Sequence, residues 1–314
     1  SWWLGVTGAA TNSASTSLAV LTVLAAISWG TSGQTRRDLV VFWRRRRGLL
    51  LVEEALFLSA FLLFLWIRGF ASDINGTEKF MDFAFLNAVT RSDTFPPIDP
   101  WLAPSPTMPD PRVNYYYFGY LCHGLLIQLT GVAPAEGFNL SLALVFAMVA
   151  VATFSIGYSV ARDQVVTDAS GRRPDAIGTP LPSGDWAPGL AVPYLVGGGS
   201  TAALTLLAGN LWTVLRRFDG SGIWDRDFWS GIGWNATRVL VIKDGDRDVD
   251  YTINEFPAFS FLLGDLHPHV LTLPFVVLAI AIAYRWYVDP PYPIRVAAGV
   301  DVGSTIQGLS LIHI

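Results

Sequence analysis

The sequence predicts an all-α protein that crosses a membrane several times as a bundle of helices. Of its 314 residues, 52% are hydrophobic and only 15% are charged, and the mean hydropathy is +0.41. Water-soluble domains rarely combine these values. The charged residues also gather in a few segments and leave apolar stretches of about 20 residues, enough for a helix to cross the hydrocarbon core. Membrane lipid is therefore an expected partner, and no nucleic-acid partner is expected.

The chain is predicted to be part of a longer protein. Residues 1–308 are expected to form a single integral membrane domain, its N-terminal portion, because the chain lacks an initiator methionine and stops within an apolar stretch. Residues 309–314 (LSLIHI) resemble translated adapter sequence and are predicted to be a non-native tail. The only cysteine is Cys122, which excludes an intrachain disulfide.

The first two predicted spans enclose the most basic segment of the chain. Residues 17–30 form a short apolar stretch, and residues 48–70 form a clearer one. Between them lie Arg36, Arg37 and the run 44–47, which is predicted to be a loop and, by the positive-inside rule, cytoplasmic. Glu53 and Glu54 are expected to reach the inner headgroups or to pair with these arginines.

With this orientation, residues 71–114 form an exterior loop and residues 138–160 cross inward. Arg172 and Arg173 follow that span and favour a cytoplasmic position for the next loop. A full crossing by Tyr115–Thr130 would place them outside, so that helix is predicted to be interfacial or re-entrant.

The last third of the chain predicts two more spans. Residues 189–209 are expected to return outward, kinked by Pro193 and by the glycines at 197–199. Residues 210–257 form a second exterior loop that is rich in tryptophan, and the chain then crosses inward from about 256 to 287.

The first exterior loop offers candidate catalytic residues. Glu78 and Asp82 are spaced one turn apart on a predicted helix, which places two carboxylates on one face just outside the membrane. An ordinary solvated helix face is the alternative interpretation. The candidate substrate-binding residues of this loop are Lys79, Arg91, Asn114, Tyr115, Tyr116 and Tyr117, although three consecutive tyrosines alone indicate only an aromatic belt.

A second group of candidate binding residues stands at the start of the last span. Asp265 is placed to cap that helix, and Pro268 fits its first turn. His267 and His269 then lie at a helix N-terminus, which favours an anion such as phosphate. A divalent metal ion is the weaker alternative, because this spacing splays two side chains apart on a helix. The histidines could also simply sit among lipid headgroups.

Three blocks of sequence carry a resemblance to a known family. They are EKFMDFAFLNAVTRSDTFPPIDPWLA (78–103), NYYYFGY (114–120) and NEFPAFSFLLGDLHPH (254–269). The chain resembles an uncharacterised multi-pass membrane family of archaea and Chloroflexi that is named for its YYY motif. More distantly, its layout is similar to that of the GT-C superfamily of glycosyltransferases that use lipid-linked sugars. There, an acidic motif begins a large exterior loop, although the usual adjacent Asp-Glu pair is absent here.

These observations predict a membrane glycosyltransferase that uses a polyprenyl-phosphate sugar donor at the extracytoplasmic face. Asp82 or Glu78 is the expected general base, with Lys79, Arg91, His267 or His269 offsetting the charge of the lipid phosphate. The base and the phosphate site must then meet in space. The alternative is a non-enzymatic multi-pass membrane protein, either a transporter or a scaffold for envelope assembly.

Overall fold

The protein is mostly helical. The computed structural model describes residues 2–31, 33–170, 188–208, 237, 241–251 and 255–288. The described helices are α1 (Trp2–Val6), α2 (Ala14–Thr31), α3 (Gly33–Gly69), α4 (Lys79–Arg91), α5 (Phe118–Thr130), α6 (Pro134–Ser170), α7 (Pro188–Ala203), the π-helix η1 (Leu204–Ala208), α10 (Pro257–Leu263) and α11 (Pro268–Val288). Strands β1 (Val241–Asp244) and β2 (Arg247–Tyr251) form an antiparallel hairpin within the second predicted exterior loop.

Among the described residues, three helices are long and apolar enough to cross a membrane. They contain the segments Arg46–Gly69 of α3, Pro134–Asp163 of α6 and all of α11. These segments match the spans predicted at 48–70, 138–160 and 256–287, although the last crossing helix begins only at Pro268. The predicted span at 17–30 corresponds to α2, an apolar helix that is shorter than these three.

The basic segment is helical, which corrects the prediction of a loop. Helix α3 continues through Arg36, Arg37 and the run 44–47 for 37 residues. No proline or glycine interrupts residues 34–47, and arginine is a good helix former, so a high density of charge does not end the helix. Glu53, which was predicted to reach the headgroups or the arginines, accepts a hydrogen bond from Ser155 of α6 at 2.5 Å.

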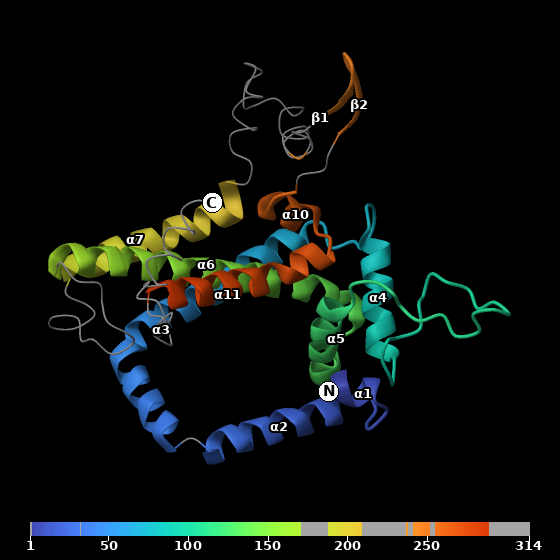
Figure 1. Ribbon diagram of the computed structural model, residues 1–314, viewed down its shortest axis with the longest axis horizontal. Coiled ribbons are helices and arrows are strands. Elements are labelled where there is room, and N and C mark those ends of the chain that lie inside the picture. Colours follow the sequence, from blue (N-terminus) through green and yellow to red (C-terminus); the bar gives the residue numbers. More distant parts are fainter. Residues whose placement is uncertain are drawn as a thin grey trace, which may run out of the picture.

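Two short helices lie across one end of the bundle. Helices α3, α6 and α11 lie alongside one another, and α4 and α5 run nearly at right angles to them (Figure 1). Helix α5 is about 20 Å long, too short for a hydrocarbon core of about 30 Å. This orientation agrees with the prediction that residues 115–130 do not cross. The helix begins at Phe118, however, so the three tyrosines precede it.

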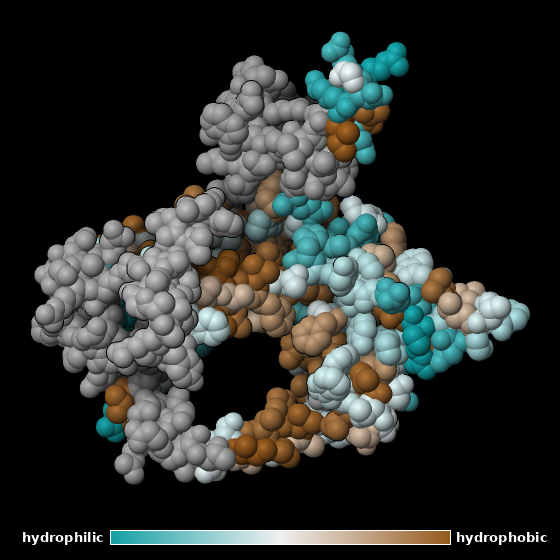
Figure 2. Space-filling model, in the orientation of Figure 1, coloured by the Kyte–Doolittle hydropathy of each residue, from teal (hydrophilic) through white to brown (hydrophobic). Residues whose placement is uncertain are grey.

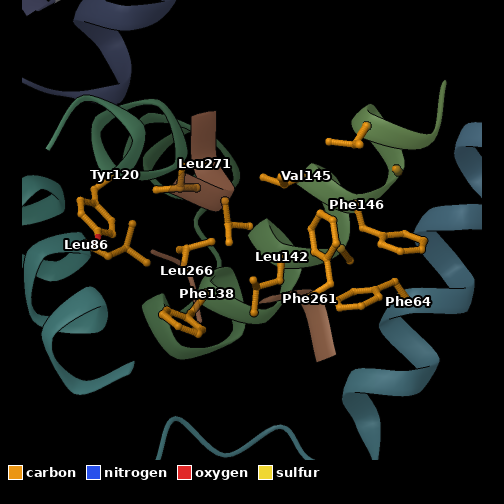
Figure 3. Close-up of a cluster of buried hydrophobic side chains, with 14 of the residues drawn as sticks. Phe64, Leu86, Tyr120, Phe138, Leu142, Val145, Phe146, Phe261, Leu266 and Leu271 are labelled. Carbon is orange, nitrogen blue, oxygen red and sulfur yellow. The ribbon is translucent and has the colours of Figure 1, made fainter. Parts of the chain in front are cut away.

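An aromatic core joins the bundle to its crosswise end (Figure 3). Phe64 of α3 stacks on Phe146 of α6, with ring centroids 4.7 Å apart, and Phe261 of α10 packs edge-on against both. Further along, Leu86 of α4 and Tyr120 of α5 are completely buried in the same cluster. The core therefore fixes the positions of α4 and α10 relative to the spans.

Helix α2 stands apart from this core. Its hydrophobic side chains are exposed along its length, for example Leu18, Leu21, Leu24 and Ile27. Figure 2 shows the hydrophobic surface of α2 beside an opening that separates it from α11. A helix that is apolar all round is suited to contact with lipid or with further membrane helices.

Glycines bring α6 and α7 into close contact. A Cβ atom added to Gly198 would stand 2.8 Å from the carbonyl oxygen of Phe154, whereas one added to Gly199 would meet nothing within 4 Å. Helix α7 continues through Pro193. The glycines predicted to kink this helix thus allow its backbone to approach α6, as small residues do between membrane helices.

Alanine substitutions in this glycine run are expected to have opposite effects. Gly198→Ala should destabilise the protein, because the new methyl group overlaps the Phe154 backbone. Gly199→Ala should leave stability unchanged or raise it by up to about 1 kcal/mol, since alanine is the better helix former. Thermal unfolding of the two variants in detergent checks the prediction, and equal melting temperatures would contradict it.

Several sequence-based predictions concern segments outside the described residues. They include the cytoplasmic loop with Arg172 and Arg173 and the tryptophans of the second exterior loop, Trp212, Trp224, Trp229 and Trp234.

Candidate functional site

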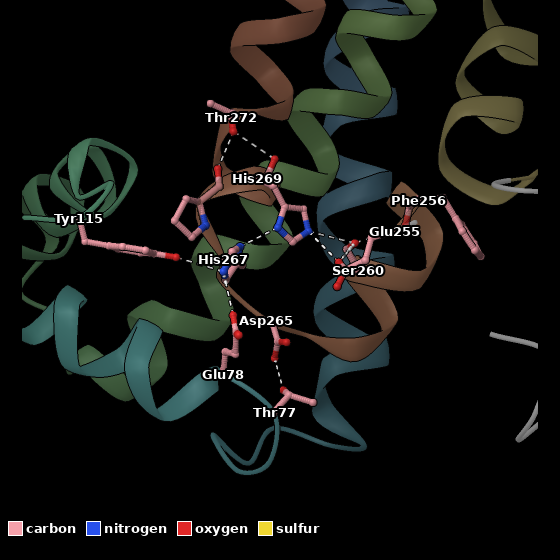
Figure 4. A network of polar contacts seen from close by, with 11 residues as sticks. Thr77, Glu78, Tyr115, Glu255, Phe256, Ser260, Asp265, His267, His269 and Thr272 are labelled. Atoms are coloured by element: carbon pink, nitrogen blue, oxygen red, sulfur yellow. Dashed lines mark hydrogen bonds and ion pairs between the residues drawn. The ribbon is translucent and has the colours of Figure 1, made fainter. Parts of the chain in front are cut away.

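The two predicted groups of polar residues meet at the end of the bundle (Figure 4). The carboxylate of Glu78, the residue just before α4, lies 2.8 Å from Nε2 of His267. One residue earlier, the Thr77 hydroxyl donates to Asp265 at 2.6 Å. Segments nearly 190 residues apart in sequence are therefore in direct contact, as the sequence analysis predicted.

The two histidines face each other. Nδ1 of His267 lies 2.6 Å from Nδ1 of His269. The prediction that their side chains splay apart was wrong because α11 begins at Pro268, so His267 precedes the helix and helical spacing does not apply. Within the described residues, no group of three or more His, Cys, Asp or Glu side chains could hold a metal ion.

Glu255 completes this group, and the sequence analysis assigned it no role. Its Oε2 lies 2.8 Å from Nε2 of His269 and accepts a hydrogen bond from the Ser260 hydroxyl at 2.7 Å. The hydrogen bond from His269 is the main cause that lowers the pKa of Glu255, and burial opposes it. Glu255 stands two residues before α10, and its place within the 254–269 block was the only sequence signal for it.

Asp82 occupies an enclosed position beside this group. Its side chain has no exposed surface, and Oδ1 accepts a hydrogen bond from the Tyr120 hydroxyl at 2.5 Å. Burial raises its pKa to about 7, with further contributions from the charges of Asp265 and Glu78, while the Tyr120 hydrogen bond opposes the shift. Asp82 can thus change protonation near neutral pH, whereas Glu78 is the carboxylate open to solvent.

Asp265 does not cap α11, contrary to the prediction. It lies three residues before the helix and bonds instead to Thr77. Burial raises its pKa, and burial also lowers the pKa of the nearby Lys79. The preceding Gly264 has a φ of 75°, and a Cβ there would overlap the guanidinium of Arg68, so this turn requires glycine.

An aromatic pocket of about 720 Å³ adjoins the histidines. It is lined by Trp2, Tyr115, Tyr116, Tyr117, Phe118, Gly119, His267, Pro268, His269, Leu271, Thr272 and Phe275. Most of these side chains are apolar or aromatic, and the imidazoles supply the main polar groups. This volume lies within the range of small-molecule sites.

Each of the three tyrosines has its own place in the pocket. The Tyr115 hydroxyl lies 3.3 Å from His267 Nε2, and its ring stacks on Phe85. Tyr117 accepts a hydrogen bond from the Trp2 indole at 3.0 Å. Tyr116 is largely exposed. The motif therefore forms one wall of the pocket, and only Tyr115 reaches the polar group.

Two predicted binding residues are not among those that line the pocket beside the histidines. Arg91 is in the last turn of α4, about 18 Å along the helix from Lys79, with its side chain exposed. Asn114 is also exposed, just before the tyrosines. The charge-offsetting role expected of Arg91 and the substrate-binding role expected of Asn114 stay predictions.

Comparison with known proteins identifies a family. The model of the family described as Uncharacterized membrane protein (DUF2298) matches residues 1–299. No curated protein and no solved structure matches the chain.

Proposed function

The chain belongs to this DUF2298 family of membrane proteins, and we propose that it is a membrane glycosyltransferase that takes a sugar from a polyprenyl-phosphate donor. One observation carries the proposal: an aromatic, largely apolar pocket ends at paired histidines and at the carboxylate of Glu78. A lipid-linked donor carries matching chemical groups in the same order as the pocket: an apolar chain, then the phosphate and the sugar.

Each part of the site has a role in this proposal. The aromatic wall holds the first isoprene units, and the start of α11 with its histidines binds the phosphate. Glu78 acts as general base on the acceptor hydroxyl, because its carboxylate is 60% exposed while Asp82 is enclosed. Lys79 and His267 offset the charge that develops on the departing phosphate.

The placement of the polar groups supports an enzyme over a transporter. Glu78, Glu255 and the histidines all gather at one end of the bundle, whereas transporters usually bind their substrates near the middle of the bilayer. No observation favours a scaffold for envelope assembly.

We further propose that this site faces the exterior of the cell membrane. In intact cells, a membrane-impermeant thiol reagent is expected to label a cysteine at position 93 but not one at position 42, in a Cys122→Ser background. The reason is that the arginines at 44–47 hold their end of α3 in the cytoplasm. Labelling at 42 but not at 93 would reverse the orientation.

An assay with the full-length protein tests the function. The purified protein in lipid nanodiscs is mixed with radiolabelled sugars on polyprenyl phosphate and with membrane extracts as acceptor. Release of sugar from the lipid or its transfer to an acceptor supports the proposal. Intact donors across a panel of sugars, with a folded protein, would contradict it.

A further inference from the structure

We infer that Glu78, His267, His269 and Glu255 form one proton-sharing unit that holds a single imidazolium between two carboxylates, with Glu255 as its positioning residue. The four side chains form an unbroken chain of short contacts. Glu78 meets Nε2 of His267, the two Nδ1 atoms meet each other, and Nε2 of His269 meets Glu255. All four ring nitrogens are thereby engaged (Figure 4).

Counting protons fixes the charge of this unit. Each outer nitrogen faces an ionised carboxylate, which only accepts, so both Nε2 atoms must carry a proton. The inner contact of 2.6 Å needs one proton between the two Nδ1 atoms. If both rings were neutral, the lone pairs of the two Nδ1 atoms would point at each other. If both rings were charged, their two Nδ1–H groups would point at each other. Three protons on four nitrogens make one ring an imidazolium.

The distance between the rings favours a proton over a metal ion. Two nitrogens that bind one tetrahedral zinc ion at about 2.0–2.1 Å stand about 3.3 Å apart. The Nδ1 atoms lie 2.6 Å apart, so a metal ion would require the rings to separate. A hydrogen bond accounts for the contact without any such movement.

The surroundings oppose a second charge on the pair. Burial and the neighbouring charge of His269 lower the pKa of His267, and the carboxylates of Glu78, Glu255 and Asp265 oppose this. From the other elements, Tyr115 approaches His267 Nε2, and Lys79, Arg68, Asp82 and Asp73 are further ionisable groups at this end of the described structure. A second charge on the pair would therefore meet both the cost of burial and the repulsion of the first.

Glu255 orients the unit from the His269 end. The Ser260 hydroxyl donates to the same Oε2 atom that faces His269, and Ser260 is buried in the first turn of α10. Glu255 thereby keeps the Nε2 proton on His269, which leaves Nδ1 to share the inner proton. At the outer end, the exposed Glu78 can be replaced at His267 by a bound phosphate, which would draw the imidazolium onto His267; this consequence rests on the proposed function.

The test is nuclear magnetic resonance of the full chain, labelled with ¹⁵N-histidine, in lipid nanodiscs without any sugar donor. At pH 7 we expect three protonated nitrogens on His267 and His269 together, and one strongly deshielded proton that couples to both Nδ1 atoms. His269→Gln assigns the signals, since it removes the two ring nitrogens of His269 and the proton that they share with His267. Two neutral rings or two independent imidazolium ions at pH 7 would overturn the inference.

Variants at Glu255 test its positioning role. Glu255→Gln should lower the pH at which the pair loses its shared proton by about 1 to 3 units, because an opposite charge in contact is lost. Glu255→Asp should recover most of the shift, and Glu136→Gln, an exposed position at the start of α6, should leave it unchanged. An unaltered titration in Glu255→Gln would refute the role. These readouts need no transfer activity, so they stand or fall separately from the proposed function.

Discussion

Glu78→Gln is expected to lower the rate of sugar transfer by about 10² to 10⁴-fold, the usual contribution of a general base. Glutamine keeps the size and the hydrogen-bonding capacity of the side chain but cannot take a proton from the acceptor hydroxyl. Because Glu78 is exposed and stands before α4 rather than in the core, the variant should fold and insert normally. The measurement is the initial rate of transfer in nanodiscs with donor in excess.

Two further variants show how that result should be interpreted. Glu136→Gln makes the same chemical change at an exposed position outside the site and should retain full activity. Asp82→Asn distinguishes the two candidate bases: if it abolishes transfer while Glu78→Gln retains it, the base is Asp82 and the assignment to Glu78 is wrong.

Asp82→Asn is also expected to change how stability depends on pH. In the folded protein the pKa of Asp82 is raised from 3.8 to about 7. Between these values the folded state holds a proton that the unfolded state has released, so the wild-type protein loses stability as pH rises from about 4 to 7. The loss amounts to about 4 kcal/mol. Asparagine imitates the protonated carboxyl group and removes this contribution.

Thermal unfolding in detergent between pH 4.5 and 8 measures the effect. The melting temperature of Asp82→Asn, relative to that of the wild type, should rise with pH up to about 7 and then level off. Asp110→Asn, at an exposed position paired with Arg112, is the control and should follow the wild type. Parallel curves for wild type and Asp82→Asn would show that Asp82 does not bind a proton in this range.

Sequence patterns predicted the parts of the fold that depend on hydrophobic length. The spans at 48–70 and 138–160 follow from apolar runs, which report directly on lipid contact. The convergence of Glu78 with His267 followed from the expected topology, which placed both at the same membrane boundary. Patterns of this kind require no knowledge of side-chain packing.

Contacts that depend on backbone detail were not predictable in this way. The histidine pair forms because α11 starts one residue after His267, and element boundaries are poorly defined by sequence. Glu255 joins the site through the short turn of α10, which carries no distinctive motif. Likewise, burial of Asp82 against Tyr120 depends on how α4 packs on α5, which neither helix specifies alone.

The unbroken course of α3 makes the orientation of the protein sensitive to bilayer thickness. From Arg47 to Arg68 the helix rises about 32 Å, close to the depth of a hydrocarbon core of about 30 Å. Arg68 is held at its end by two hydrogen bonds to Asn139, so this end of α3 is fixed relative to α6. A thinner bilayer would favour tilting of the whole bundle, and with it of the pocket, whereas a thicker bilayer would have to thin around the protein.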